Sequence, residues 1–133
     1  MSHEDVNFIG AAGEAAVAAE LAAAGFHVFT PAFGSPKIDM IAERDGRLIR
    51  LQVKTLAGDA KALRFCTWGA NYGSGYSGEV DWLALHSLHY GVTAFLKPDE
   101  AGAYPTIRYD TEDTTARQAR DYSIERLTKE AEN

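Results

Sequence analysis

Residues 38–55 read IDMIAERDGRLIRLQVKT, and they give the most informative pattern in the chain. Asp45 and Gly46 near its centre form one of the dipeptides that most strongly predict a two-residue β-hairpin turn. If these two residues occupy the turn, the numbers of opposed residues add up to 91, so that Arg44 faces Arg47. The stretch therefore predicts two antiparallel strands with a defined register.

The alternation of side chains supports this register. One predicted face is apolar throughout, and it consists of Ile38, Met40, Ala42, Ile49, Leu51 and Val53. The other face carries Asp39, Ile41, Glu43, Leu48, Arg50, Gln52 and Lys54. A slip of one residue in either strand would mix the two sets, because side chains in a strand alternate with a period of two. The register places Asp39 opposite Gln52 and Lys37 opposite Lys54, with opposed Cβ atoms about 5 Å apart.

Asp39, Gln52 and Lys54 form a candidate catalytic site on the second face. Carboxylate and amide oxygens are hard ligands of the kind that Mg²⁺ and Mn²⁺ prefer. Lys54 projects from the same face, where its ammonium would stabilise charge that develops on a phosphate or orient an attacking water. A bound metal would polarise a phosphoryl oxygen and lower the pKa of its water. The alternative interpretation is a polar sheet face on which Asp39 and Lys54 pair in water.

The rest of the chain predicts a helix, several strands and a closing helix. Residues 7–24 are rich in alanine and predict a helix that ends at Gly25, whereas residues 1–6 are expected to be disordered. Further strands are predicted at residues 27–30, 64–68, 80–86, 92–96 and 106–109. A closing helix is predicted at residues 123–132, with Ser123 as its cap. The pattern predicts a single α/β domain, residues 1–133, with a mixed central sheet flanked by helices.

Composition narrows the class of protein. A chain of 133 residues with 46% hydrophobic content can build one core. The single cysteine, Cys66, is interpreted as a core side chain, and it indicates a reducing compartment because it has no partner for an internal disulfide. The N-terminal residues lack the pattern of a signal peptide, and the apolar windows are interpreted as too short to span a bilayer. We therefore expect a cytoplasmic protein with no membrane contact.

Charge is unevenly distributed along the chain. The net charge is −6, which by itself argues against nucleic acid as a partner. Residues 37–64, however, hold seven basic and four acidic side chains, so this segment is +3 and the remainder −9. A basic region of this kind fits either a phosphate-contacting surface or ordinary solvated charges.

Two further motifs carry a resemblance to a known family. The residues Ser35-Pro36-Lys37-Ile38-Asp39, followed after the turn by Gln52-Val53-Lys54, resemble the PD-(D/E)XK signature of restriction enzymes, Holliday-junction resolvases and intron-encoded endonucleases. Gly10-Ala11-Ala12-Gly13-Glu14 resembles the helix that precedes this signature in resolvase-like members. Together with Gly78-Glu79-Val80-Asp81-Trp82, these motifs are most similar to the small intron-associated members, over roughly residues 10–96.

The resemblance implies a restriction-endonuclease-like fold and Mg²⁺- or Mn²⁺-dependent hydrolysis of DNA phosphodiester bonds. Asp39, Gln52, Glu14 and the Val53 carbonyl would hold the metal, and Lys54 would act on the phosphate or the water. The glycines and alanines beside Glu14 would let the helix approach the sheet closely, while a solvated Glu14 is the alternative. The chain departs from the family pattern at Gln52, which replaces an acidic residue, and at residues 56–79, which predict a strand and a glycine-rich loop where the family has a helix.

Several polar residues are candidates for contact with DNA. The candidates for nucleic-acid binding are Lys37, Arg50, Lys61, Arg64, Tyr72 and Tyr76. Arg50 is expected either to contact a phosphate or to pair with Glu43, and Asp81 either to bond to the loop before it or to support the site. DNA and a second copy of the chain are the expected partners, and no small-molecule cofactor is expected. Two other functions stay open: a catalytically inactive nucleic-acid-binding module, and a protein-interaction domain on the same fold.

Overall fold

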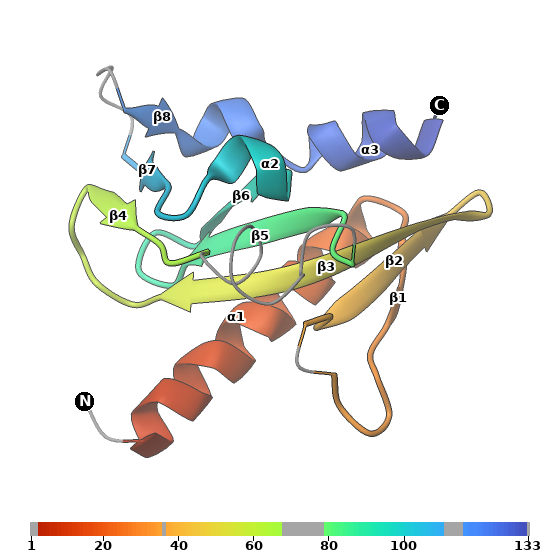
Figure 1. Ribbon diagram of the computed structural model, residues 1–133, viewed down its shortest axis with the longest axis horizontal. Helices are drawn as coiled ribbons and strands as arrows, with labels where there is room; N and C mark the ends of the chain where they lie inside the picture. The colour runs from red at the N-terminus through yellow and green to blue at the C-terminus, as the bar shows by residue number, and fades with distance from the viewer. Residues whose placement is uncertain (1–2, 36, 68–78, 111–115, 133) are drawn as a thin grey trace.

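A five-stranded mixed sheet forms the centre of the molecule (Figure 1). The computed structural model describes residues 3–35, 37–67, 79–110 and 116–132. The sheet has the strand order β1-β2-β3-β5-β6, with β1 His27–Phe29, β2 Met40–Arg44, β3 Arg47–Leu56, β5 Trp82–Ser87 and β6 Val92–Leu96. Strands β3 and β5 are parallel, and the other neighbouring pairs are antiparallel. The predicted α/β class with a mixed central sheet is confirmed.

The helix α1 covers one face of this sheet, and a smaller layer covers the other (Figure 1). The smaller layer contains a three-stranded sheet of order β4-β7-β8, with β4 Ala62–Arg64, β7 Thr106–Arg108 and β8 Arg117–Gln118. Two short helices accompany it: α2 Pro98–Ala101 and the 3₁₀ helix η2 Ala119–Tyr122. A third, α3 Glu125–Glu132, instead buries Leu127 and Ala131 in the core that α1 forms with the sheet. The closing helix thus begins two residues after the predicted cap, Ser123.

The hairpin of β2 and β3 has the predicted register. The pairs run from Arg44 with Arg47 to Met40 with Leu51, and the residue numbers of every pair add up to 91. Asp45 and Gly46 have φ values of 53° and 83°, and a two-residue turn with positive φ at both positions matches the twist of the strands that it joins. The paired strands end at Met40, so Asp39 lies just outside the ladder.

Helix α1 spans His3–Ala23 and ends as predicted at Gly25. Gly25 has a φ of 89° and donates its N–H to the Ala22 carbonyl, and the next residue bonds to the Leu21 carbonyl, which together close the helix end. The helix starts four residues earlier than predicted, so the expectation of disorder is wrong for residues 3–6.

By length and composition, the segment Asp5–Ala23 passes as a membrane span, which the sequence analysis did not expect. A helix on the core of a soluble protein passes the same test. In this fold Val17 and Leu21 of α1 are fully buried against the sheet, and 17% of the candidate span is buried.

The packing of α1 on the sheet depends on a close contact between Gly13 and Thr55. A Cβ atom placed on Gly13 would lie 1.8 Å from the Thr55 Oγ1 and 2.7 Å from the Thr55 Cβ. At that distance no side chain can stand on residue 13 while the helix keeps its position. The predicted close approach of helix and sheet is therefore confirmed at Gly13, whereas a Cβ on Gly10 would meet nothing within 4 Å.

Two apolar cores result, one on each face of the main sheet. The core between α1 and the sheet includes Val17, Leu21, Met40, Ala42, Ile49, Leu51, Trp82, Ala84 and Phe95. The second core, under the smaller layer, includes Leu63, Phe65, Leu83, Leu85, Ala94, Leu96 and Ile107. The predicted apolar face of the hairpin is thus the face that packs against α1. Because side chains alternate along β3, Gln52 and Lys54 project from the opposite face.

The connection between β3 and β5 contains a short strand, and Cys66 lies just after that strand. Within residues 57–67 and 79–81, which the structure describes, this connection contains β4 and no helix, as residues 56–79 predicted. β4 is shorter than predicted and lies two residues earlier. Cys66 is exposed, so its interpretation as a core side chain is wrong: its neighbours Phe65 and Thr67 point inward, and Cys66 points outward.

We predict that Gly13→Ala lowers the free energy of unfolding by about 1–3 kcal/mol, because the added methyl group overpacks the contact with Thr55. Urea denaturation followed by circular dichroism measures this change. Gly10→Ala is the matched control, and it is expected to raise the free energy by about 0.5–1 kcal/mol through helix propensity alone. Adding Thr55→Ala to Gly13→Ala should recover part of the loss. Equal stability of Gly13→Ala and the unchanged protein would contradict the contact.

Candidate active site

The candidate site lies just before the first residue of β2, where the neighbouring strand β3 extends beyond β2. β2 begins at Met40, but β3 runs on to Leu56, so the second half of β3 extends beyond the end of its neighbour. Asp39 occupies this step. Its N–H donates to the Leu51 carbonyl at 2.9 Å, and its carboxylate Oδ2 accepts the Val53 N–H at 2.7 Å. The carboxylate therefore takes the place of a strand partner, which holds it against the edge of β3.

The Val53 carbonyl is directed to the same edge as the Asp39 carboxylate. In a strand, the N–H and the C=O of one residue point to the same side, toward the same neighbouring strand. The Val53 N–H points to Asp39. The Arg50 carbonyl points to the opposite edge of β3, toward β5, where it accepts the Asp81 N–H. The Val53 carbonyl oxygen is thus available beside Asp39, as the resemblance implies.

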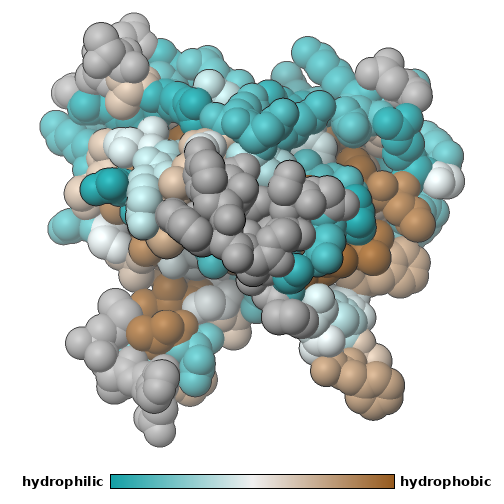
Figure 2. Space-filling model, in the orientation of Figure 1, coloured by the Kyte–Doolittle hydropathy of each residue, from teal (hydrophilic) through white to brown (hydrophobic). Residues whose placement is uncertain are grey.

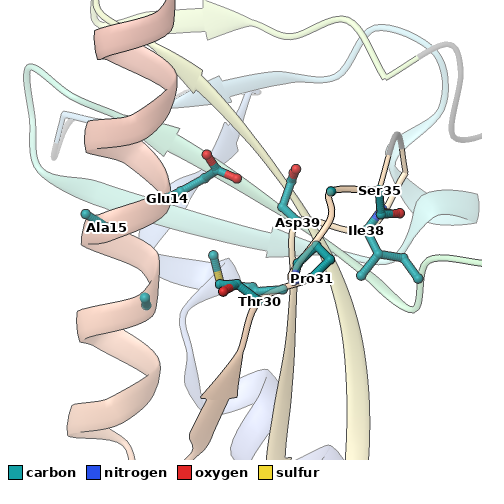
Figure 3. Close-up of a pocket in the computed structure, with 10 residues that line it drawn as sticks. Glu14, Ala15, Thr30, Pro31, Ser35, Ile38 and Asp39 are labelled. Atoms are coloured by element: carbon teal, nitrogen blue, oxygen red, sulfur yellow. The ribbon is translucent and has the colours of Figure 1, made fainter.

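Glu14 reaches the site from the middle of α1. Figure 3 shows its carboxylate turned toward that of Asp39 across the space between the helix and the sheet. The position follows from the close contact one residue earlier, at Gly13, which brings this part of α1 against β3. Glu14 is half-buried rather than solvated, so the alternative of a solvent-facing side chain is not what the structure has.

Ionisation is unfavourable for both carboxylates in the folded protein. Burial raises the pKa of Glu14, and the nearby charge of Asp39 and a hydrogen bond with it raise the pKa further. Burial also raises the pKa of Asp39, and this effect exceeds the opposing ones from the Val53 N–H, Glu14 and Lys54. Two desolvated carboxylates side by side form a site that a cation would stabilise.

Lys54 lies close enough for its positive charge to lower the pKa of Asp39. Its side chain is half-buried, on the face of β3 away from α1. The structure thus brings together Glu14, Asp39, Val53 and Lys54 of the predicted set.

Gln52 is the predicted site residue with the most unusual environment. It is 5% exposed, and its Oε1 is buried with no hydrogen-bond partner among the residues that the structure describes. Leaving such an oxygen unsatisfied costs about 1–3 kcal/mol, so a buried amide oxygen of this kind normally has a partner. A cation at the step between β2 and β3 would provide one, and the donor set of two carboxylates, a carbonyl and an amide oxygen suits Mg²⁺ or Mn²⁺.

In the described residues no group of three or more His, Cys, Asp and Glu side chains is arranged to hold a metal. The composition of the candidate site explains this finding. Two of its four donors are an amide oxygen and a backbone carbonyl, which belong to none of those residue types. The fit to a metal therefore rests on Gln52 and Val53 as much as on the carboxylates.

A cavity of about 410 Å³ opens beside the two carboxylates. Its walls come from α1, from the loop after β1 and from the start of β2, with the residues Glu14, Ala15, Ala18, Thr30, Pro31, Gly34, Ser35, Ile38, Asp39 and Met40. Figure 3 shows Thr30, Pro31 and Ser35 across from α1. The proline and glycine content of residues 31–36 predicts a turn there, but nothing in the sequence places this turn at the site.

Arg50 and Asp81 form a structural pair beside the site. Asp81 accepts hydrogen bonds from the Arg50 N–H at 2.8 Å and from its guanidinium at 2.9 and 3.0 Å. Burial alone would raise the pKa of Asp81, but these hydrogen bonds and the charge of Arg50 bring it below the ordinary value. Arg50 therefore pairs with Asp81, which was not among the partners expected for it, and Asp81 is held by Arg50. Most of the loop before Asp81 lies outside the described residues.

The other candidates for DNA contact are spread over the molecule. The Lys37 Nζ lies 2.9 Å from a carboxylate oxygen of Glu79. Lys61 precedes β4 and Arg64 ends it, both exposed, and the Arg64 guanidinium lies over the Tyr104 ring. Tyr72 and Tyr76 lie outside the residues that the structure describes.

Comparisons with known proteins identify the family and the fold of the chain. Residues 5–85 match the model of the PD-(D/E)XK endonuclease family, so the chain belongs to this family. Its fold is similar to that of a bacterial homing endonuclease, I-Ssp6803I, with a TM-score of 0.74 and 12% identity over 95% of this chain and 91% of that one. It is also similar to Hjc, a Holliday junction resolvase from the archaeal hyperthermophile Archaeoglobus fulgidus, with a TM-score of 0.50 and 18% identity over 74% and 83% of the two chains. A comparison with curated proteins gives no match.

We predict that Glu14→Gln makes the metal-free protein more stable than the unchanged protein at pH 7. A carboxyl group with a raised pKa in the folded state loses stability as the pH rises above the ordinary carboxyl range, because the unfolded chain releases the proton more readily. The gain should shrink as the pH falls to about 4, where Glu14 carries a proton in both states.

Urea denaturation in EDTA between pH 4 and pH 7 measures this difference. Glu132→Gln, at an exposed position at the end of α3, is the control and should show no such pH dependence. A Glu14→Gln protein that is less stable than the unchanged one at pH 7 would contradict the repulsion between the two carboxylates.

Proposed function

We propose that the chain is a divalent-metal-dependent endonuclease that hydrolyses DNA phosphodiester bonds. The observation that carries the proposal is the convergence of Glu14, Asp39 and the Val53 carbonyl at one step in the sheet, beside the charge of Lys54. Membership of an endonuclease family and the fold shared with a homing endonuclease and a resolvase support it.

Asp39, the Val53 carbonyl and Gln52 would hold Mg²⁺ or Mn²⁺, with Glu14 as a further ligand, directly or through water. When bound, such a cation polarises a phosphoryl oxygen and lowers the pKa of a coordinated water. The hydrogen bond from the Val53 N–H fixes one Asp39 oxygen, so Oδ1 is the atom of that carboxylate left to turn toward a ligand. Gln52 adds an oxygen without adding a third negative charge, so affinity for the metal should be lower than with a glutamate there.

Lys54 would act on the phosphate itself. Its side chain is half-buried, and its positive charge is close enough to lower the pKa of Asp39. In such a partly buried place, a hydrogen-bond donor stabilises a developing negative charge more than it would in water. It would donate a hydrogen bond to a non-bridging phosphate oxygen or hold the attacking water in line. Removing a single preorganised donor of this kind typically costs a factor of about 10²–10³ in rate.

Approach of DNA depends on local rather than net charge. The chain is −6 overall, but residues 37–64, which include the site strands, are +3. Lys37 sits at the entry to β2, and its partner Glu79 is half-exposed, so a phosphate could compete for it. Lys61 and Arg64 lie on the second sheet, and their contact with DNA, like that of Tyr72 and Tyr76, stays a prediction.

One observation favours a different function. An amide at position 52 supplies no charge to a metal, and the chain as a whole is acidic, as expected if the site had lost activity and retained only nucleic-acid binding. That alternative predicts DNA binding that weakens with salt and no cleavage with any metal. A protein-interaction domain would bind no DNA at all.

We predict that the protein cleaves labelled DNA in Mg²⁺ or Mn²⁺, and that Asp39→Ala and Lys54→Ala each slow cleavage by a factor of about 10²–10³ or more. Gel electrophoresis of end-labelled duplex, single-stranded and branched DNA measures the products. Asp59→Ala and Lys129→Ala change the same residue types at exposed positions away from the site, and they should cleave at the original rate.

Calorimetric titration with Mg²⁺ gives a readout that does not depend on cleavage. Asp39→Ala should lose the metal, and Gln52→Glu should bind it more tightly by adding a charged ligand. If the protein cleaves none of the substrates and also binds no metal, the proposed function is wrong.

We further propose a homodimer that works in the cytoplasm. A domain of this size covers little DNA, and a second copy would allow cleavage of both strands. The free, exposed thiol of Cys66 suits a reducing compartment. Size-exclusion chromatography with light scattering tests the dimer, and a monomer at both low and high protein concentration would contradict it.

A further inference from the structure

Phe33 is an aromatic side chain that packs against nothing in the described fold. Its relative exposure is 102%, the highest among the large apolar residues of the described chain. It sits in a turn in which the Gly34 N–H donates to the Pro31 carbonyl at 3.4 Å and Gly34 has a φ of 80°. A ring in such a position stabilises no core, so the fold alone does not account for a phenylalanine there.

The turn that carries Phe33 is also a wall of the candidate active site. Pro31, Gly34 and Ser35 line the same cavity as Glu14 and Asp39. The Ser35 hydroxyl oxygen accepts the N–H groups of Ile38 at 3.1 Å and Lys37 at 3.4 Å, which ties the turn to the start of β2. Phe33 thus belongs to a turn whose neighbouring residues line the cavity with Asp39, and it lies only six residues before Asp39 in the chain.

The turn lies on a part of the molecule that projects from the sheet. Figure 1 shows the loop between β1 and β2 and the first half of α1 projecting from the same side of the sheet. Figure 2 shows the molecule hollowed between these two projections, on the side where the cavity opens. Phe33 stands in the chain between Pro31 and Gly34, which both line the cavity, and residues 30–35 carry no charge.

An exposed ring beside a phosphodiester site fits a nucleobase better than a second copy of the chain. Stacking of a base on an aromatic side chain contributes about 1–3 kcal/mol, and every base offers a flat face for it. A stable protein interface needs about 800 Å² from each partner, which one turn of small residues around a single ring does not supply. Apolar side chains on minor-groove proteins also insert between base steps and unstack them.

We propose that Phe33 stacks on a nucleobase next to the scissile phosphate, and that the substrate is DNA in which this base is unpaired or easily unstacked. The inference rests on the proposed endonuclease function and specifies its substrate class. A base in a perfect duplex must first give up its stacking, whereas a mismatched, branched or single-stranded base offers its face at a lower cost. The ring would thereby favour distorted DNA over regular duplex.

The test compares cleavage of a perfect duplex with cleavage of the same duplex carrying one mismatch, in Mg²⁺. The unchanged protein should cleave the mismatched duplex faster. Phe33→Ala should lose roughly 5- to 150-fold of its kcat/KM on that substrate, the equivalent of about 1–3 kcal/mol of stacking. Phe33→Trp should restore the preference, because it keeps an aromatic face.

Phe8→Ala is the matched control, since Phe8 is also an exposed phenylalanine, at 72%, but lies on α1 and outside the cavity wall. It should cleave both duplexes like the unchanged protein. Fluorescence of 2-aminopurine placed at the mismatch, measured in Ca²⁺ in place of Mg²⁺, reports stacking without cleavage. The unchanged protein and Phe33→Trp should quench it more than Phe33→Ala does.

The outcomes separate this inference from the proposed function. If the unchanged protein cleaves in a metal-dependent way but Phe33→Ala keeps its rate and its quenching, the stacking role is overturned and the nuclease stands. If no protein cleaves but the quenching depends on Phe33, stacking stands and catalysis fails. If Phe33→Ala instead abolishes self-association measured by light scattering and leaves quenching unchanged, a second copy covers the ring and the inference is wrong.

Discussion

The contact between Gly13 and Thr55 is the constraint on which the rest of the site depends. It lets α1 lie so close to β3 that a single added methyl group would collide with the strand. Glu14, the next residue, is carried by that approach to the edge where Asp39 stands. A helix held farther from the sheet would leave Glu14 in solvent and Asp39 as an isolated carboxylate. Close packing at Gly13 thus brings together two carboxylates, Glu14 and Asp39, from distant parts of the chain.

The unequal lengths of β2 and β3 provide the second half of the arrangement. Because β2 begins only at Met40, the edge of β3 beyond Leu51 has backbone groups that no strand pairs. The Asp39 carboxylate accepts one of them, from Val53, and leaves the carbonyl of the same residue directed at the site. The result is a set of oxygens whose carboxylates are costly to keep charged without a counter-ion, as the raised pKa values of Glu14 and Asp39 indicate. The geometry that gives the Val53 N–H a hydrogen-bond partner therefore also places the carboxylates of Asp39 and Glu14 close together.

Gln52 changes the electrostatics of this site without changing its shape. An acidic residue at that position would add a third charge to two carboxylates that already resist ionisation. The amide avoids this repulsion but leaves a buried oxygen without a hydrogen-bond partner in the described chain. Beside it, Arg50 and Asp81 satisfy each other through three hydrogen bonds and tie β3 to the start of β5. Arg50 and Asp81 are thus paired with each other, whereas the Gln52 Oε1 has no partner in the described chain and is available to the metal that we propose.

The hairpin, its register and the end of α1 could be predicted from the sequence and are confirmed, and the residues of the candidate site stay a prediction made from it. These follow from short-range rules: a two-residue turn at Asp45 and Gly46, a period of two along each strand, and a glycine after the helix. Only the tertiary structure decided that Asp81 pairs with Arg50, that Cys66 faces solvent, and that the turn carrying Phe33 forms a wall of the cavity. Each of these depends on contacts between segments far apart in the chain or on how one element lies over another. Periodicity within a segment specifies which face is apolar, but not what will cover it.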